Sequence, residues 1–331
     1  MRSFCRSLRA RRCLALLSSV ACAGPAPSPS TAADTPPEAP PPAWAGLIGD
    51  YASGGDTLSV REEAGELQAV FWRDSTNPSD LDQAAVEAAP DGKGIRVTVS
   101  GRAFERIALG PAEGNVFRIT PRRPVEELRR EAQAATPPQE SGDFLATDLV
   151  ELVTLDSTIK QDIRYASTDN FMSEVFYSSP RAFLQRPAAE ALVRAHRALA
   201  ARGYGLLIHD GYRPWYVTRM FWDATPDSLR MFVADPTQGS RHNRGAAVDL
   251  TLYDRSTGQP VEMPGVYDEF SPRSFPHYPG GTSRQRWHRE LLRQAMEAEG
   301  FAVYPAEWWH FDYGEWRRYR IGNLTFETIA R

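Results

Sequence analysis

Two short polar blocks, far apart in the chain, set the strongest constraint on how this sequence can fold. The first block contains His242 and Asp249, and the second contains Glu307 and His310. Two imidazoles and a carboxylate are common metal ligands, and three protein ligands with a fourth position left open are typical of a catalytic zinc site. Glu307 then remains as a carboxylate for proton transfer. The fold must therefore bring both blocks to one place.

The first block predicts a bend followed by a core strand. Gly245 and the small residues after it let the chain turn between His242 and Asp249, which a regular strand would place on opposite faces. Val248 and Leu250 flank Asp249 in the pattern of a buried strand. We therefore expect Asp249 to be rigidly mounted on that strand.

The second block predicts a dry environment for its carboxylate. Glu307 belongs to an aromatic run with Trp308, Trp309 and Phe311. Exclusion of water by these rings would raise the pKa of Glu307 towards neutrality, because burial disfavours the charged carboxylate. A pKa in that range suits a general base.

Cysteine usage and charge narrow the possible partners. The three cysteines, Cys5, Cys13 and Cys22, lie near the N-terminus, so no thiol further along the chain can bind metal or form a disulfide. Any metal must be held by His, Asp or Glu. Residues 1–21 carry five arginines and no acid, and their removal would change the net charge from 38 − 42 = −4 to 33 − 42 = −9. This acidity disfavours nucleic acid as a partner, because phosphate binding needs a basic face.

The N-terminus has the pattern of an export signal over residues 1–22. Arginines precede an apolar run from Leu14 to Ala21, which is far shorter than the roughly 20 residues of a membrane span. Ser19-Val20-Ala21-Cys22 resembles a bacterial lipoprotein processing site, which predicts a lipid anchor at Cys22 and a place in the periplasm or cell envelope. Ordinary cleavage, which would give a soluble exported protein, is the alternative.

The length exceeds one typical core, so we expect more than one domain. Residues 23–43 hold eight of the 26 prolines and predict an extended tether. Residues 44–122 show apolar alternation at strand period and predict a small antiparallel sheet or barrel, an accessory module with a structural or positioning role. Its expected turns are Gly54-Gly55, Gly65, Asp91-Gly92 and Gly114-Asn115. Residues 123–142 predict a helix and a linker, and residues 143–331 mix helices and strands without regular alternation, which predicts an α+β domain with an antiparallel sheet.

Several elements of this last part can be predicted individually. A strand is expected within Leu152–Ile163 and another at Leu206–Ile208, and helices are expected at Pro124–Ala135, Pro187–Gly203, from Trp215 onward, and at Ser283–Glu299.

The other histidines have ordinary interpretations: His196, His277 and His288 are expected in contact with solvent, and His209 as a structural hydrogen-bonding residue. Asp210 either orients Arg213 or starts a turn.

Three separated motifs resemble those of the D-alanyl-D-alanine dipeptidases of the vancomycin-resistance type. The motifs are Ser240-x-His242-x-x-Gly245-x-Ala247-x-Asp249, Glu307-x-x-His310 and Asp210-Gly211-Tyr212-Arg213-Pro214. The resemblance covers roughly Asp143 to Arg331. It implies the fold that these zinc peptidases share with D-Ala-D-Ala carboxypeptidases, lysostaphin-type enzymes and the Hedgehog signalling domain.

The resemblance also implies roles for the residues of these motifs. It implies one zinc ion on His242, Asp249 and His310, with Glu307 as the general base. It further implies that Arg213 binds the substrate's carbonyl oxygen as negative charge develops there, a task that suits a permanent cation.

The expected function is hydrolysis of D-Ala-D-Ala or a similar D-amino-acid dipeptide. Ser240 and Asp268 match positions that hold the substrate's free ammonium group in the family, so long chains would be rejected. One alternative is a zinc D,D- or L,D-carboxypeptidase that acts on murein stem peptides. Another is a non-catalytic, metal-stabilised binding module of the Hedgehog sort, against which Glu307 and Arg213 argue because a structural metal site needs neither.

Overall fold

The computed structural model describes residues 35–71, 82–88, 96–107, 112–113 and 116–329. The expected export signal with Cys22, most of the Pro-rich tether, and the turns Asp91-Gly92 and Gly114-Asn115 lie outside these residues. Among the residues that are described, no helix is both long and apolar enough to span a bilayer.

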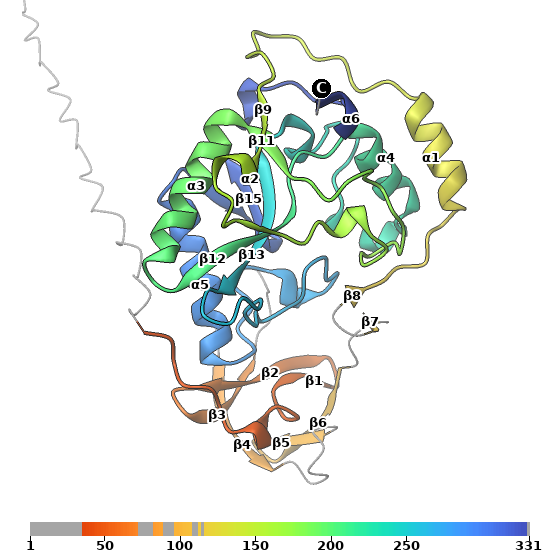
Figure 1. Cartoon of the computed structure of the whole chain (residues 1–331). Coiled ribbons are helices and arrows are strands. Elements are labelled where there is room, and N and C mark those ends of the chain that lie inside the picture. Colours follow the sequence, from red (N-terminus) through yellow and green to blue (C-terminus); the bar gives the residue numbers. More distant parts are fainter. Residues whose placement is uncertain (1–34, 72–81, 89–95, 108–111, 114–115, 330–331) are drawn as a thin grey trace, which may run out of the picture. The chain divides into compact units, whose positions relative to one another are not determined.

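Six strands near the N-terminus form a closed antiparallel barrel in chain order (Figure 1). They are β1 (Gly49–Ser53), β2 (Asp56–Glu63), β3 (Glu66–Phe71), β4 (Asp82–Ala88), β5 (Arg96–Val99) and β6 (Arg102–Arg106). Tyr51, Leu58 and Phe104 belong to its buried apolar cluster. A small sheet or barrel was expected here, but β4 and β6 were not predicted. In β6, Phe104 is the only buried residue and charged residues flank it. The short strands β7 (Ala112–Glu113) and β8 (Val116–Phe117) pair separately.

A five-stranded sheet forms the centre of the remaining chain. Its order is β10 (Lys160–Gln161), β12 (Tyr204–Asp210), β13 (Ala247–Asp254), β15 (Glu307–Tyr313) and β14 (Phe301–Tyr304). All neighbours are antiparallel except β10 and β12, which run parallel. A separate antiparallel pair is formed by β9 (Leu149–Glu151) and β11 (Phe183–Gln185). The mixture of helices with a mainly antiparallel sheet agrees with the predicted α+β class.

The expected helices are present with small shifts at their ends. The α-helices are α1 (Val125–Ala134), α2 (Leu152–Leu155), α3 (Arg186–Ala200), α4 (Trp215–Ala224), α5 (Ser283–Glu297) and α6 (Phe326–Ile329). The 3-10 turns are η1 (Pro42–Trp44), η2 (Arg164–Ala166), η3 (Asp227–Phe232), η4 (His242–Arg244), η5 (Pro272–Ser274) and η6 (Trp316–Arg318). Helix α5 begins with a capping box, in which the Thr282 side chain accepts from the Gln285 amide and the Gln285 side chain accepts from the Thr282 amide.

The strand predicted within Leu152–Ile163 is present but is only two residues long. Helix α2 occupies the start of that range, and only the two residues of β10 pair with the sheet. Leu152 is fully buried at the start of this helical turn. A short apolar run can be buried in either conformation, so periodicity alone does not decide between them.

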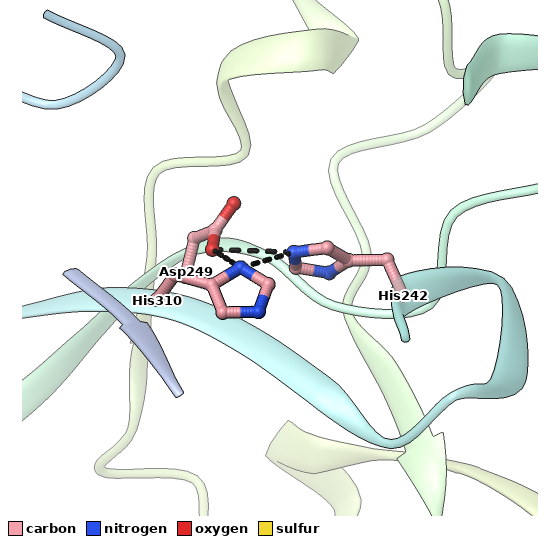
Figure 2. Close-up of side chains that lie close together, drawn as sticks. All are labelled: His242, Asp249 and His310. Atoms are coloured by element: carbon pink, nitrogen blue, oxygen red, sulfur yellow. Dashed lines mark hydrogen bonds and ion pairs between the residues drawn. The ribbon is translucent and has the colours of Figure 1, made fainter. Parts of the chain in front are cut away.

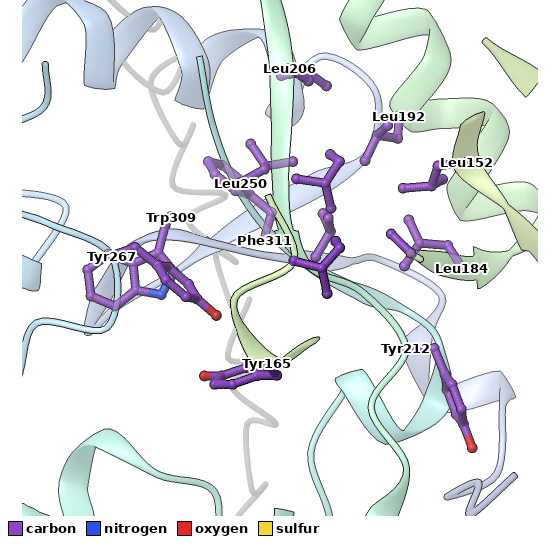
Figure 3. Close-up of a cluster of buried hydrophobic side chains, with 14 of the residues drawn as sticks. Leu152, Tyr165, Leu184, Leu192, Leu206, Tyr212, Leu250, Tyr267, Trp309 and Phe311 are labelled. Atoms are coloured by element: carbon purple, nitrogen blue, oxygen red, sulfur yellow. The ribbon is translucent and has the colours of Figure 1, made fainter. Parts of the chain in front are cut away.

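The apolar side chains of the central sheet form one large core with the helices that pack on it. Leu192 of α3, Leu206 of β12 and Leu250 of β13 gather there (Figure 3). Successive side chains of a strand point to opposite faces, so Leu250 and Asp249 point to opposite faces of β13. One face of the sheet therefore packs into the core and holds β13 in place, and the other face presents polar side chains such as Asp249.

Two histidines that were expected at the solvent are instead buried. The His196 Nδ1 accepts the Leu206 amide at 3.1 Å, and its Nε2 lies 2.8 Å from the Thr158 hydroxyl. His288 contacts the Tyr204 hydroxyl at 3.3 Å. Both lie on helices, where the sequence shows a polar residue but not its distant partner. His277 is exposed, as predicted.

The barrel contacts the start of α5 and the loop before it. The Tyr278 hydroxyl donates to the Asp50 carboxylate at 2.7 Å. Glu62 accepts from the Ser283 amide at 2.7 Å, at the N-terminus of α5, where the helix dipole favours a negative charge. Glu63 accepts from Arg286 at 2.9 Å. These contacts link β1 and β2 to one segment of the chain, residues 278–286.

We predict that Gly245→Ala destabilises the protein by about 2–3 kcal/mol, against about 1 kcal/mol for Gly203→Ala. Both glycines have a left-handed backbone, with φ of 65° and 86°. A Cβ at Gly245 would lie 2.5 Å from the Leu149 side chain, whereas one at Gly203 meets no atom within 4 Å. Urea unfolding followed by tryptophan fluorescence measures both changes. Equal losses of unfolding free energy in the two variants would mean that the contact with Leu149 adds nothing to the destabilisation.

Candidate metal centre

Three side chains from the two predicted blocks converge at one point (Figure 2). The Asp249 Oδ1 lies 3.2 Å from the His242 Nε2 and 3.0 Å from the His310 Nδ1. The two histidine nitrogens are 3.0 Å apart. All three residues are buried, with 2%, 2% and 6% of His242, Asp249 and His310 exposed.

The sheet and one bend bring these atoms together. Asp249 on β13 and His310 on β15 are direct cross-strand partners, so their side chains leave the same face. His242 lies in η4, and Gly245 ends that turn in the left-handed conformation that the sequence predicted as a bend. Strand β13 then begins two residues later, at Ala247.

Hydrogen bonds at the far nitrogens orient both imidazoles. The His242 Nδ1 donates to the Gly211 carbonyl at 2.7 Å, which leaves the Nε2 lone pair for the centre. The His310 Nε2 lies 2.9 Å from the Asp312 Oδ1, which leaves its Nδ1. Partners of this kind fix the tautomer and ring orientation of a metal-binding histidine.

The Asp249 carboxylate has one engaged oxygen and one unpartnered oxygen. Its Oδ2 accepts from the Tyr267 hydroxyl at 3.0 Å and lies 3.6 Å from the Arg213 guanidinium. Its Oδ1 is buried and makes no hydrogen bond of good geometry. Ligands bound at about 2.0–2.2 Å in a tetrahedral site lie roughly 3.3 Å from one another. The separations around Oδ1 therefore fit one small divalent ion.

The charges of this cluster are strongly coupled. Burial opposes the charged carboxylate, but His242 and His310 hold the pKa of Asp249 well below its usual range. Burial also opposes a charged imidazole, yet close contact with the Asp249 and Asp312 carboxylates raises the pKa of His310 to about 10. The positive charge of His310 therefore helps to balance the buried Asp249 carboxylate.

Glu307 lies beside this cluster without being part of it. Its Oε2 is 3.7 Å from the His310 Nδ1. Burial raises the pKa of Glu307 to about 7, although the charge of His310 acts in the opposite direction. This agrees with the sequence prediction of a carboxylate whose pKa is shifted towards neutrality, the range that suits proton transfer.

Arg213 is fixed by Asp210 and two aromatic rings. Its guanidinium contacts the Asp210 Oδ2 at 2.8 and 2.9 Å and lies 5.1 Å from the Tyr165 ring centre and 5.0 Å from that of Phe221. Asp210 in turn accepts from the Tyr177 hydroxyl at 2.8 Å. Of the two roles considered for Asp210, its contacts fit the orientation of Arg213.

Ser240 and Asp268 line the same cleft, which has a volume of about 90 Å³ and includes Arg213, Glu307 and the three converging residues. The Ser240 hydroxyl accepts the His242 amide at 3.2 Å. Asp268 accepts from the Tyr165 hydroxyl at 2.8 Å. Its φ of 56° is left-handed, which is strained for a residue with a side chain and points to a functional position. Burial, together with the charge of Asp249, raises the pKa of Asp268 well above its usual value.

Four groups at the site were not assigned a role from the sequence. They are the Tyr165 and Tyr267 hydroxyls, the Gly211 carbonyl and the Asp312 carboxylate. The position of Asp312 beside His310 could have been predicted from the sequence, because residues two positions apart on a strand share a face. Tyr165 lies in the three-residue turn η2 and Tyr267 in a loop, and neither segment is long enough to show a periodic pattern. His209 stacks on Tyr267 at 4.6 Å and lies 3.3 Å from the Asp162 carbonyl, which agrees with its expected structural role.

We predict that binding of a divalent metal ion to the metal-free protein at about pH 7.5 releases about one proton from His310. With a pKa of about 10, its imidazole is protonated at that pH, and it must be neutral to act as a ligand. The metal affinity should therefore rise with pH until this pKa is passed. Calorimetric titration in buffers of different ionisation enthalpy counts the protons. Release of only a small fraction of a proton would contradict this assignment.

The chain is similar in sequence to several known peptidases. A family model described as D-ala-D-ala dipeptidase matches residues 145–323. The D-alanyl-D-alanine dipeptidase of Escherichia coli K12 is 35% identical over 166 residues, which are 50% of this chain and 84% of that protein. That of Enterococcus faecium is 34% identical over 174 residues (46% and 85%), and that of Streptomyces coelicolor is 35% identical over 193 residues (53% and 93%).

The matched segment contains the central sheet and every residue of the cleft described above, and it excludes the β barrel. It covers more than half of the chain, and the relatives are covered over most of their own length. The chain therefore belongs to the D-Ala-D-Ala dipeptidase family and is a metallopeptidase.

Proposed function

We propose that this protein is a zinc-dependent dipeptidase that hydrolyses D-Ala-D-Ala or a similar D-amino-acid dipeptide. The observation that carries the proposal is the cleft in which three convergent ligand atoms, the Glu307 carboxylate and the Arg213 guanidinium lie together. The relatives that align with this chain over most of their own length are named D-alanyl-D-alanine dipeptidases. The small, largely buried cleft suits a short substrate better than a long chain.

His242, Asp249 and His310 would hold the zinc ion. Their donor set of two imidazoles and one carboxylate is that of a catalytic site with an open position. When bound, zinc lowers the pKa of a water molecule and polarises a carbonyl group. Asp312 and the Gly211 carbonyl keep the two imidazoles in the ligand tautomer.

Glu307 would serve as the general base and then as the general acid. In its charged form the carboxylate takes a proton from the attacking water, and it later delivers that proton to the nitrogen of the leaving amino acid. Its position 3.7 Å from the His310 Nδ1 places it beside the ligand cluster. General acid–base catalysis of this kind contributes roughly 10²–10⁴-fold to the rate.

Arg213 would face the carbonyl oxygen of the scissile bond. Asp210 and the Tyr165 and Phe221 rings fix the guanidinium before substrate arrives, so its charge needs no reorganisation during the reaction. A preorganised donor aimed at developing negative charge contributes roughly 10²–10³-fold. Arg213 also lies 3.6 Å from the Asp249 Oδ2, close to the ligand cluster.

Ser240 and Asp268 would hold the free ammonium group of the dipeptide. Asp268 is a buried carboxyl with a raised pKa, and an ammonium group next to it would favour its charged form. The Ser240 hydroxyl retains a lone pair in addition to the one that accepts the His242 amide. An N-acylated substrate would bring no cation to this position and would leave the carboxyl without a charged partner.

We further propose that residues 143–331 share the fold of the Hedgehog-type zinc peptidases, with residues 44–122 as an accessory module. Lipidation at Cys22 and a location at the cell envelope remain proposals from the sequence pattern. Outside the cytoplasm, the substrates of such an enzyme would be dipeptides released from cell-wall peptides.

We expect the wild type to release D-alanine from D-Ala-D-Ala and to leave N-acetyl-D-Ala-D-Ala intact. Glu307→Gln should lower kcat by about 10²–10⁴-fold and Arg213→Ala by about 10²–10³-fold, with the bound zinc retained in both. Amino-acid release is measured by chromatography, and zinc by atomic absorption. Equal cleavage of the acetylated substrate would favour the carboxypeptidase instead. A wild type that cleaves nothing but melts at lower temperature after chelation would favour the binding module.

We also propose that the barrel positions the loop that carries Asp268. Asp50 on β1 is a half-buried carboxylate that accepts from the Tyr278 hydroxyl at 2.7 Å and from the Ser59 hydroxyl at 2.5 Å. Tyr278 lies in the same irregular segment as Asp268, between β13 and α5. A fixed contact at this end would restrict the positions available to the loop.

For this role we predict that Tyr278→Phe raises KM for D-Ala-D-Ala by about 3- to 10-fold and leaves kcat within about twofold. The change removes only the hydroxyl that binds Asp50, so it loosens the loop and leaves the metal ligands in place. Tyr253→Phe is a matched control, because its hydroxyl donates to the Thr158 carbonyl at 2.8 Å without touching the barrel. Steady-state kinetics separate the two parameters. The same kinetics for both variants would count against a positioning role.

A further inference from the structure

Arg241 is a cation in the wall of the cleft that the proposed reaction does not use. It lies between Ser240 and His242 in the sequence and lines the cleft together with Glu307, His310 and Tyr304. Its side chain is 35% exposed, whereas that of Arg213 is 10% exposed. Arg241 is therefore the more accessible of these two cleft guanidiniums.

Aromatic rings hold this guanidinium more than its acidic neighbour does. Its central carbon lies 5.0 Å from the Trp316 ring centre and 5.5 Å from that of Tyr304. Its Nε is 3.5 Å from the Asp312 Oδ2, a longer separation than the 2.8 Å between Arg213 and Asp210. Contact through a ring face leaves the in-plane N–H groups of a guanidinium able to bind a planar anion.

Arg241 and Asp268 connect to the ligand cluster through different residues. Asp268 accepts from Tyr165, whose ring lies against Arg213, and Arg213 lies near the Asp249 Oδ2. Arg241 is linked instead to His310, through Asp312. It also lies over Tyr304, which is the cross-strand partner of Glu307 in the β14–β15 pair. The cation is thus on the Glu307 side of the cluster.

The order of groups in a dipeptide matches this arrangement. Its ammonium group belongs to the first residue, next to the scissile carbonyl. Its carboxylate belongs to the second residue, whose nitrogen would receive the proton from Glu307. A group that binds the carboxylate must therefore lie on the Glu307 side, away from the group that binds the ammonium. A guanidinium suits a carboxylate, because it can donate two parallel hydrogen bonds.

From this geometry we propose that Arg241 binds the C-terminal carboxylate of the dipeptide and is a specificity-determining residue. The proposal rests on the proposed dipeptidase function. With Asp268 for the ammonium and Arg241 for the carboxylate, the cleft recognises both ends of a zwitterion. A substrate with a third residue at either end would carry one of its charges past the group that binds it.

The test compares D-Ala-D-Ala with D-alanyl-D-alaninamide, in which an uncharged amide replaces the carboxylate. The wild type should prefer the free acid in kcat/KM by about 10- to 100-fold. Arg241→Gln should lose a similar factor on the acid, mainly through KM, and cleave acid and amide at similar kcat/KM. Arg241→Lys should restore part of the preference, since it returns the charge without the planar fork.

Arg317→Gln is the matched control. The Arg317 guanidinium lies 4.1 Å from the ring centre of the same Trp316, but Arg317 is exposed and is not among the residues that line the cleft. Its loss should leave the preference for the acid unchanged. Zinc content is measured for each variant, because Asp312 contacts both Arg241 and His310.

Several results would overturn the proposal. A wild type that cleaves acid and amide equally well removes the carboxylate subsite while leaving the dipeptidase intact. The same holds if Arg241→Gln, with its zinc retained, keeps the preference of the wild type. A wild type that cleaves neither compound overturns the proposed function and this subsite together. The acid-to-amide ratio of the wild type needs no variant, so a poorly folding Arg241→Gln does not prevent the test.

Discussion

The pairing of β13 with β15 is the constraint on which the site depends. It places Asp249 directly opposite His310, and the side chains of the two residues leave the same face of a sheet whose other face is packed with aliphatic and aromatic residues. A slip of one residue in this register would turn either ligand into the core, because successive side chains alternate between faces. Packing of the core face and convergence of the ligands are therefore set by the same register.

Burial makes the charges of the cleft interdependent. A carboxylate such as Asp249 is costly to bury unless cations compensate it, and the positive charges of His310 and Arg213 supply this compensation. The same water exclusion that creates this cost also raises the pKa of Glu307 to about 7. The charge compensation of Asp249 and the raised pKa of Glu307 thus have one physical origin, the burial of several charged groups in one cleft.

Much of this arrangement could be predicted from the sequence, because the relevant signals are local. Adjacent residues predict three features: the bend at Gly245, the buried strand around Asp249 and the raised pKa of Glu307. The missed features depend on distant partners instead. The burial of His196 follows from contacts with β12 and Thr158, and the roles of the Tyr165 and Tyr267 hydroxyls follow from where two loops meet. Sequence periodicity does not predict such contacts between distant segments.

The loop that carries Asp268 shows why a module outside the matched segment bears on the cleft. A left-handed Asp268 persists only if its surroundings hold it there. Next to it, the Glu269 carboxylate accepts the Val266 amide at 2.9 Å and the Ser271 hydroxyl at 2.6 Å. The Phe270 ring stacks on Phe117, from the strand that follows the barrel, at 5.2 Å. The N-terminal part of the chain thus contacts this loop at Phe270 and, through Asp50, at Tyr278. The contact of Tyr278 with the barrel and the strained Asp268 are therefore features of one loop.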